Sequence, residues 1–463
     1  MPAATQLNAV DFGFTPGAPN PSAALTSAIA AAITQGKPLF IEPGVYTVGN
    51  VLIDGRLEMT GVSGRVTLKM ATGSNAILRA LDAGDVLIRG ITFDGGGLTP
   101  VDAYGVGYRA LVVAQRTTSV NFTIRFETCD FRQASADEAH PAQGGYGLGA
   151  SKCSLYVTNC EFTELFAAVG ASDHDGFAFQ GNKVLNMANN GVVTSRASGV
   201  PSFTRVSANR FAAVGRTQLD STGWQGNAIY ISQESNVLVA QNEIYNCAFS
   251  SIRLNGCARS RVAQNHCDKH GEVAIYVEGF SDGRQVANDG FDVVVSDNVV
   301  NDAGVGIAVG NINVGGRLSV IANNVIRRIS RRNVAVGTTA EYTSPGRGVS
   351  TETCTIVANN FIEDAFEGVN VNGGSDTADS VVIGNVIRVT TRAMGVGGAS
   401  GGKDVLVADN LAAGTGALGA GGGALRQLTA AGAVTGSTEL ASFTENTATA
   451  NLRIEGVVKR QTL

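Results

Sequence analysis

The chain has 463 residues and a formal net charge of −5, and only 16% of its residues are charged. This acidic balance, without a basic run interleaved with aromatic residues, argues against a nucleic-acid-binding surface. No stretch approaches the roughly 18 apolar residues that span a bilayer. The 59 glycines fit a fold with many tight turns. The chain has only ten prolines, as expected where continuous strand ladders must not be interrupted.

A capping helix is predicted near the N-terminus. Asn20 is a residue type that favours the N-cap position, and Pro21 favours the first helical position. Gly36 is a typical C-terminal stop. The segment 21–35 between these signals carries an apolar stripe. In a solenoid such a helix covers the open end, where a terminal strand otherwise exposes unpaired backbone groups.

A short phrase, apolar–x–x–Asn–x–apolar, recurs along the middle of the chain at steps of 22 to 36 residues. Cys129 and Cys160 occupy the central position in its two earliest copies. The later copies centre on Asn182, Asn209, Asn242, Asn265, Asn298, Asn324, Asn360, Asn385 and Asn410. A fixed phrase with variable padding indicates a solenoid whose loops differ in length. We expect these asparagines to stack in one turn column, each in a left-handed conformation.

A second alternating apolar stretch follows most copies of the phrase, so each repeat contains at least two short strands. Neither strand buries its apolar side alone, and stacking repeats gives them a shared interior. The predicted fold is therefore all-β: a right-handed, single-stranded parallel β-helix. Seven cysteines, several at inward positions, are expected to be buried free thiols, and no cofactor or metal site is predicted.

The chain is predicted to form one domain over residues 1–463. The N-terminal strand and capping helix take residues 1–40, and the coils take residues 41–410. An Ala/Gly-rich stretch and an irregular C-terminal cap take residues 411–463, with one further strand at Phe443–Thr447.

The N-terminal motifs resemble those of the pectate-lyase-like β-helix superfamily. They are Asp11-Phe12-Gly13, the segment 38–48 and the segment 88–95. The resemblance implies a carbohydrate-active protein acting on a polysaccharide or oligosaccharide. The paired-Asp and Gly-His-Gly motifs of the polygalacturonase branch and the calcium-binding clusters of pectate lyases are missing from the sequence.

Three segments, 247–253, 271–278 and 315–318, resemble a bacterial family of twin-arginine-translocated repeat proteins to which no reaction is assigned. This resemblance implies a periplasmic or extracellular location. No twin-arginine signal is present in this chain, and the sequence predicts neither a nucleic-acid partner nor an oligomeric state.

The second strands of three consecutive repeats predict a site, because alternate residues of a strand point outward. Their outward files are Tyr230, Arg253 and Tyr276 beside Ser232, Asn255 and Glu278. Such a face offers a sugar aromatic rings for stacking, a guanidinium for a carboxylate, and polar groups for hydroxyls.

Lyase chemistry assigns roles to these residues. β-Elimination on a uronate requires a cation for the enolate charge, a base for the C5 proton and an acid for the leaving oxygen. Arg253 fits the first role, and Tyr276 or Tyr230 the proton transfers if Arg253 lowers the tyrosine pKa. Glu278 either orients Arg253 or acts as acid. The alternative is that this exposed face is ordinary solvated surface with common cross-strand pairs.

Other residues are predicted to bind substrate. Trp224, the single tryptophan, lies in a polar insertion and is expected to form a lid or sugar platform; Gln233 and Asn255 extend the site. His174 beside Asp173 is either a general base held by a carboxylate or a turn residue. A hydrolase pair would combine Asp173 with Glu278 or Glu234.

Three functions therefore remain open. The first is a polysaccharide lyase acting through Arg253 and the tyrosines. The second is a glycoside hydrolase or epimerase on the same face, and the third is a non-catalytic glycan-binding surface protein.

Overall fold

The computed structural model describes residues 6–101, 108–119, 121–134, 144–196, 203–215, 226–279, 292–310, 318–336, 340–351, 355–372, 380–397, 405–408, 410–414, 452–455 and 459–460. Trp224, Cys354 and the expected strand Phe443–Thr447 lie outside these ranges. The chain divides into two compact units, unit 1 (Met1–Tyr230) and unit 2 (Ile231–Leu463). A single domain over the whole chain stays a prediction.

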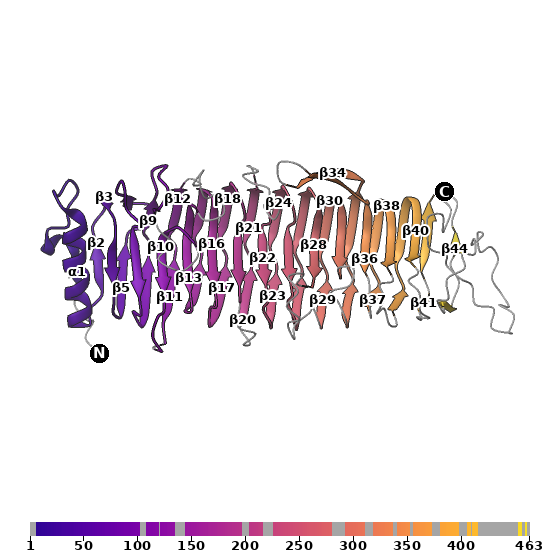
Figure 1. The fold of residues 1–463 in the computed structure, drawn as a ribbon, viewed down its shortest axis with the longest axis horizontal. Helices are drawn as coiled ribbons and strands as arrows, with labels where there is room; N and C mark the ends of the chain where they lie inside the picture. Colours follow the sequence, from indigo (N-terminus) through magenta and orange to yellow (C-terminus); the bar gives the residue numbers. More distant parts are fainter. Residues whose placement is uncertain are drawn as a thin grey trace. The chain divides into compact units, whose positions relative to one another are not determined.

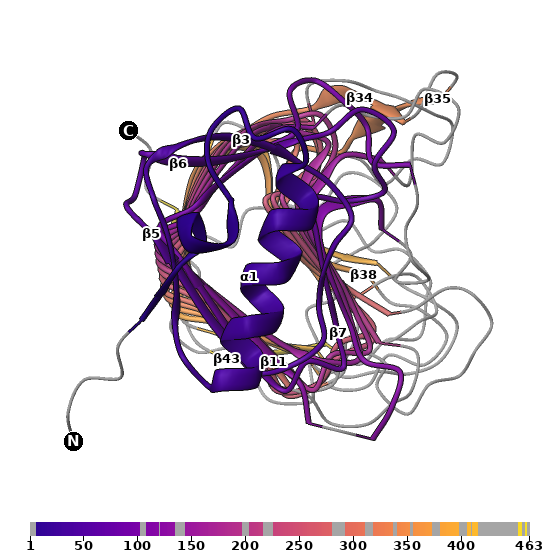
Figure 2. The ribbon, with the colours of Figure 1, turned by 90° about the vertical axis from the view of Figure 1, so that its left-hand side faces the viewer.

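Unit 1 opens with a short 3-10 helix, η1 (Ala9–Phe12), and the predicted helix, α1 (Pro21–Gln35). The Asn20 side chain accepts a hydrogen bond from the Ala23 N–H (3.2 Å), and Gly36 ends the helix at φ +59°. The buried face of α1 includes Leu25 and Ile29. Figure 2 shows α1 lying across the end of the unit 1 strands, as expected of a cap.

Unit 1 contains three rows of strands. Row A comprises β1 (Leu7–Asn8), β2 (Leu39–Ile41), β5 (Leu57–Gly61), β8 (Asp85–Arg89), β11 (Thr123–Glu127), β14 (Ser154–Thr158), β17 (Gly176–Gln180) and β20 (Phe203–Ser207). Row B comprises β3 (Gly44–Val48), β6 (Val66–Met70), β9 (Thr92–Asp94), β12 (Asp130–Ala134), β15 (Glu161–Leu165), β18 (Lys183–Met187) and β21 (Arg210–Val214). Row C comprises β4 (Val51–Ile53), β7 (Leu78–Leu81), β10 (Ala110–Gln115), β13 (Tyr146–Ser151), β16 (Ala167–Ser172) and β19 (Val192–Ser195).

Strand β22 (Ile229–Ser232) contains the division, and unit 2 repeats the three rows. Row A comprises β23 (Val237–Ala240), β26 (Ser260–Ala263), β29 (Val293–Ser296), β32 (Ser319–Ala322), β37 (Thr355–Ala358), β39 (Ser380–Ile383), β41 (Val405–Ala408) and β43 (Leu452–Glu455). Row B comprises β24 (Glu243–Cys247), β27 (His266–His270), β30 (Val299–Ala303), β33 (Val325–Ile329), β38 (Phe361–Asn372), β40 (Val386–Gly397), β42 (Leu411–Gly414) and β44 (Lys459–Arg460). Row C comprises β25 (Ile252–Asn255), β28 (Val273–Glu278), β31 (Val305–Val309) and β36 (Arg347–Thr351), continued by the second halves of β38 and β40.

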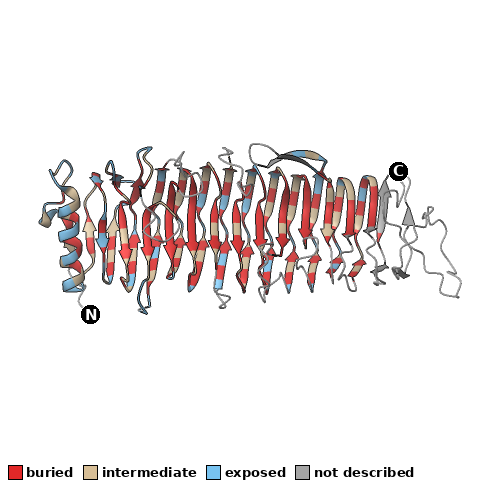
Figure 3. Cartoon of the chain, in the orientation of Figure 1, coloured by how far each residue is buried: buried red, intermediate tan, exposed pale blue. Residues whose placement is uncertain are grey.

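Each strand pairs in parallel with the strand of the next coil, so successive coils stack in register (Figure 1). The exception within the described residues is an antiparallel hairpin, β34 (Arg332–Val336) with β35 (Ala340–Ser344). Buried residues alternate with more exposed ones along most strands of rows A and B, which gives each unit an apolar interior (Figure 3). The predicted parallel β-helix is confirmed.

The asparagine column is confirmed within each unit, at the turn between rows A and B. In unit 2 each asparagine from Asn242 to Asn385 donates from its Nδ2 and its backbone N–H to the Oδ1 of the next. In unit 1 Asn182 donates to Asn209 in the same way. Cys160 holds the equivalent position, and its N–H donates to Asn182 Oδ1 (2.8 Å).

The expected left-handed conformation of these asparagines is wrong. From Asn182 to Asn385, the residue just before each asparagine takes that conformation, as at Gln241 (φ +59°) and Asp297 (φ +59°). The preceding residue makes the turn, so that the asparagine amide points inward and bonds the neighbouring coil. The six described cysteines are buried free thiols, as predicted.

Candidate functional site

The predicted face lies on row C, and in unit 2 its register is as expected. Arg253 in β25 pairs with Tyr276 in β28, and Asn255 pairs with Glu278. The residues predicted to point inward are fully buried: Ile252, Leu254, Ile275 and Val277. The alternation of apolar and polar residues along the two strands therefore places these side chains together.

Arg253 is buried and not exposed to solvent. Its Nε donates to Glu278 Oε1 (2.6 Å), its Nη2 lies 2.5 Å from the same oxygen, and its Nη1 lies 3.6 Å from Glu272 Oε2. The rings of Tyr276 and Phe249 lie 4.8 and 5.4 Å from the guanidinium carbon. Only 1% of Arg253 is exposed, and 4% of Glu278.

The expectation that these residues lie on an exposed face is therefore wrong for Arg253 and Glu278. A buried guanidinium requires charge partners, and Glu278 and Glu272 supply them within the protein. The fork that was expected to hold a uronate carboxylate already binds a protein carboxylate. Of the two roles open to Glu278, the geometry favours orienting Arg253.

Tyr276 does not have the lowered pKa that proton abstraction requires. Burial raises its pKa, the Glu278 carboxylate raises it further, and Arg253 opposes the change only in part. The expected lowering by Arg253 is wrong, because desolvation and two nearby carboxylates outweigh one cation. Tyr276 therefore keeps its proton at neutral pH and is a poor base.

The other predicted residues are distributed over both units. Tyr230 is the last residue of unit 1, so its position relative to Arg253 stays a prediction. Gln233 lies beside the Arg253 cluster, since its N–H donates to the Asn255 carbonyl (2.7 Å). Glu234 is fully buried, which removes it from an exposed hydrolase pair.

Asp173 and His174 form a turn in unit 1. Asp173 takes the left-handed conformation (φ +49°), and its N–H donates to the Ser195 carbonyl. His174 is fully buried, with its ring 5.6 Å from that of Phe177 and its Nε2 3.4 Å from Thr204 Oγ1. The structure favours the turn interpretation of His174 over the general base.

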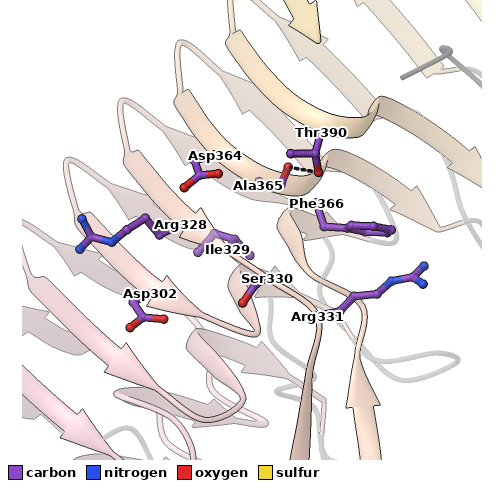
Figure 4. A pocket seen from close by; sticks show the side chains of 9 residues that line it. All are labelled: Asp302, Arg328, Ile329, Ser330, Arg331, Asp364, Ala365, Phe366 and Thr390. Carbon is purple, nitrogen blue, oxygen red and sulfur yellow. Dashed lines mark hydrogen bonds between the residues drawn. The ribbon is translucent and has the colours of Figure 1, made fainter. Parts of the chain in front are cut away.

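A pocket lies elsewhere in unit 2, at the corner where rows B and C meet. It has a volume of about 340 Å³. Figure 4 shows the nine residues that line it: Asp302, Arg328, Ile329, Ser330, Arg331, Asp364, Ala365, Phe366 and Thr390. They come from β30, β33, β38 and β40 and from the segment between β33 and β34.

The backbone at this corner explains how charged side chains reach the pocket. Asp302, Arg328 and Asp364 occupy one column in successive coils, all with positive φ (55°, 54° and 53°). This conformation occurs directly before the buried Ala303, Ile329 and Ala365, and the paired register skips the residue that adopts it in all three strands. It is tolerated by aspartate and is uncommon for arginine.

The polar groups of the pocket differ in how firmly they are held. Asp302 lies 2.6 Å from Arg332 Nη2, and the Arg331 guanidinium stacks over the Phe366 ring at 4.0 Å. Thr390 Oγ1 donates to the Ala365 carbonyl (3.3 Å). Asp364 is exposed and makes no hydrogen bond or ion pair with another residue that the structure describes. The pocket thus offers a carboxylate, guanidinium groups, hydroxyls and an aromatic ring.

The sequence did not predict this pocket. The predicted outward residues lie along row C, whereas the pocket lies at the corner between rows B and C. A signal is present in the sequence: Arg327, Arg328, Arg331 and Arg332 lie within six residues of an acidic chain.

No group of three or more His, Cys, Asp or Glu side chains gathers as a metal site in the part of the chain that the structure describes. No helix among the same residues is long and apolar enough to cross a membrane.

Comparison with known proteins gives similarities of fold. No protein-family profile matches the chain, and neither does any curated protein sequence. Among solved structures, the chain is similar to the catalytic domain of a GH87 alpha-1,3-glucanase, with 10% identity and a TM-score of 0.44 over 90% of this chain. It spans 65% of that domain's length. The Azotobacter vinelandii mannuronan C-5 epimerase AlgE6 A-module has 15% identity and a TM-score of 0.41 over 88% of this chain and 99% of its own. The Dettilon tailspike protein has 13% identity and a TM-score of 0.43 over 97% of this chain and 68% of its own.

Proposed function

We propose that this chain is a carbohydrate-active protein that binds a polysaccharide or oligosaccharide at the pocket of unit 2. The observation that carries the proposal is the pocket itself, where an aromatic ring lies among carboxylate, guanidinium and hydroxyl groups. The resemblance of the N-terminal motifs to the pectate-lyase-like superfamily supports a saccharide as the ligand. A periplasmic or extracellular location belongs to the same proposal.

The groups of the pocket match the chemistry of a sugar ring. Each sugar hydroxyl both donates and accepts hydrogen bonds, and the pocket supplies acceptors at Asp364 and donors at Arg328 and Ser330. Phe366 supplies an apolar surface for the C–H face of a ring. A volume of about 340 Å³ lies within the range typical of small-molecule sites, about 300–1,000 Å³.

The chemistry performed on the saccharide is a finer question. Elimination through Arg253 and Tyr276 lacks support, because the guanidinium is bound by Glu278 and the pKa of Tyr276 is raised. Hydrolysis is a second candidate, favoured by two pocket carboxylates, Asp302 and Asp364. They lie two coils apart, so their Cα atoms are separated by roughly 10 Å from the strand spacing. Inverting glycosidases separate their carboxyl groups by about 6.5–9.5 Å.

A binding measurement tests the site. Calorimetric titration with a panel of neutral and acidic oligosaccharides should reveal a ligand for the wild-type chain. Asp364→Asn should weaken that ligand's binding by about tenfold or more, because a hydrogen bond to a charged group contributes about 1.5–3 kcal/mol.

Asp297→Asn is the matched control. Asp297 is also exposed and also has a positive φ (59°), but it does not line the pocket. Equal loss of affinity in both variants, or binding by neither the wild type nor any variant, overturns the proposal.

Product analysis on the bound saccharide then separates the three chemistries. Unsaturated ends show elimination, new reducing ends without unsaturation show hydrolysis, and an unchanged saccharide shows a binding function alone.

A further inference from the structure

We infer that the saccharide bound at this pocket is anionic, carrying carboxylate, sulfate or phosphate groups. The inference rests on the proposed function, since it names the class of saccharide that the same pocket binds. Three observations carry it: two ladders of alternating charge beside the pocket, the charge balance of the coils that form it, and the environment of Arg331.

The first ladder lies on row B. Arg327 in β33, Glu363 in β38 and Arg388 in β40 occupy one register position in successive paired strands. Glu363 lies 3.6 Å from Arg327 Nε and 3.4 Å from Arg388 Nη1. One carboxylate therefore serves two guanidinium groups, and this ladder keeps one excess positive charge.

The second ladder repeats the pattern on row C. Arg347 in β36, Glu367 in β38 and Arg392 in β40 occupy one register position. Glu367 Oε2 accepts from Arg347 Nε (3.0 Å) and from Arg392 Nη2 (2.9 Å). Its carboxylate is only 13% exposed, and Arg347 keeps 24% exposure. The second ladder also has one excess positive charge, in a less solvated setting where charges interact more strongly.

The pocket lies between the two ladders. Along β38, Glu363 of the first ladder is followed by the lining residues Asp364, Ala365 and Phe366 and then by Glu367 of the second. A saccharide seated in the pocket therefore has an excess positive charge on either side of it.

The local charge opposes that of the whole chain. The described strands of these coils, with the hairpin of β34 and β35, and the segment joining β33 to β34 contain seven arginines against four carboxylates: Arg327, Arg328, Arg331, Arg332, Arg347, Arg388 and Arg392 against Glu341, Glu363, Asp364 and Glu367. Asp268 and Asp302 of the preceding coils pair with Arg328 and Arg332. Among these described residues one positive charge remains in excess, in a chain whose net charge is −5. A local positive excess on an acidic protein attracts an anionic ligand.

Arg331 is the residue best placed to contact the anion. It is exposed, it lines the pocket, and no carboxylate that the structure describes lies within ion-pair distance of it. Its guanidinium stacks on Phe366 at 4.0 Å, which fixes its orientation (Figure 4). A planar guanidinium held by a ring is suited to bind a carboxylate or sulfate through two parallel hydrogen bonds.

The experiment compares ligands that differ only in charge. The pairs are oligogalacturonate with its methyl ester, and dextran sulfate with dextran, each titrated against the full chain at low and high salt. At least one acidic member should bind at least tenfold more tightly than its neutral counterpart. Its affinity should fall as salt rises, because exposed charges are screened.

Arg331→Gln should weaken binding of the acidic ligand by about tenfold and leave binding of its neutral counterpart nearly unchanged. Arg331→Lys should recover part of the loss, since the charge returns without the planar fork. Arg261→Gln, which changes an exposed arginine of β26 that does not line the pocket, should have no effect.

The outcomes separate this inference from the proposed function. If the acidic and neutral members bind equally and Asp364→Asn weakens both, the inference fails and the proposed function stands. If no saccharide binds, the proposed function itself fails. If a single-stranded oligonucleotide binds more tightly than every acidic saccharide, the positive corner serves a different polymer and the inference is overturned.

Discussion

Units 1 and 2 share the same three rows of parallel strands but fill their interiors differently. Unit 1 stacks aromatic rings from coil to coil: Phe93, Phe131 and Phe162 lie with centroids 5.0 and 4.8 Å apart. Unit 2 fills the equivalent row B positions mainly with aliphatic side chains, such as Val300 and Ile326. Its turn column is a continuous series of asparagines, where unit 1 has Cys129 and Cys160 before Asn182.

The residues on the outer side of row C also differ between the two units. In unit 1 an apolar cluster of Tyr108, Ala110, Tyr146 and Phe166 covers this face. The Tyr108 ring lies so close to Gly170 that a Cβ atom there would meet it at 2.5 Å. In unit 2 the same row holds the enclosed Arg253, a smaller apolar cluster of Val273, Val305 and Ala308 with Tyr276 packed against it, and the second ladder of arginines and Glu367. The larger apolar cluster lies in unit 1, and the second ladder of arginines and Glu367 lies in unit 2.

The largest expected effect concerns the turn column. Asn298 donates to Val262, Ser296 and Asn324 and accepts from Asn265. Asn298→Ala leaves several of these buried groups unsatisfied, at about 1–3 kcal/mol each, so we expect a loss of about 4 kcal/mol in the free energy of unfolding. Urea unfolding followed by circular dichroism measures it.

Cys160→Ala at the equivalent position of unit 1 is the comparison. The Cys160 side chain stabilises the unit mainly by filling space in the interior, so we expect a loss on the order of 1 kcal/mol in the free energy of unfolding. Equal losses in the two variants would show that the column contributes alike in both units.

The second effect compares a buried ion pair with an exposed one. Glu278→Gln removes the carboxylate closest to the buried Arg253, and losing one partner of a buried pair costs about 3 kcal/mol or more. Asp175→Asn breaks the more exposed pair with Arg116 in unit 1 (2.6 Å), which should cost less than about 1 kcal/mol. The unfolding free energies of the two variants test this difference, and a Glu278→Gln chain as stable as wild type would contradict it.

The sequence predicted the fold because its signals are periodic. The recurring asparagines indicated the turn column, and the alternating apolar residues indicated which side chains point inward. Asn20, Pro21 and Gly36 marked the ends of α1 correctly. Each of these features is local, so neighbouring residues are enough to read it.

The site was predicted less well because its properties are not local. The register of Arg253 with Tyr276 and of Asn255 with Glu278 follows from the strand pattern. The burial of Arg253 does not, because it depends on Glu272 and Phe249, which lie outside the aligned positions. The pocket was missed for a related reason: positive φ values at Asp302, Arg328 and Asp364 place their side chains at a corner that a two-residue alternation does not describe.

The third expected effect is a pH dependence that originates in unit 2. His270 is buried with its ring against Ser251 Oγ (2.8 Å), and burial lowers its pKa to about 3. A hydrogen bond with the Cys267 backbone and the charge of Asp302 oppose the shift, whereas the interactions with Arg332 and His266 add to it. In the unfolded chain a histidine titrates near 6.5, so between about pH 6.5 and pH 3 the unfolded state binds the additional proton. Stability should therefore fall as the pH drops through this window, by about 1.4 kcal/mol per pH unit from this residue.

His270→Gln keeps a hydrogen-bonding group beside Ser251 and removes the titration, so the difference in unfolding free energy between wild type and variant should shrink as the pH falls. Parallel curves for the two proteins from pH 6.5 to pH 4.5 would show that the acid sensitivity of unit 2 arises elsewhere.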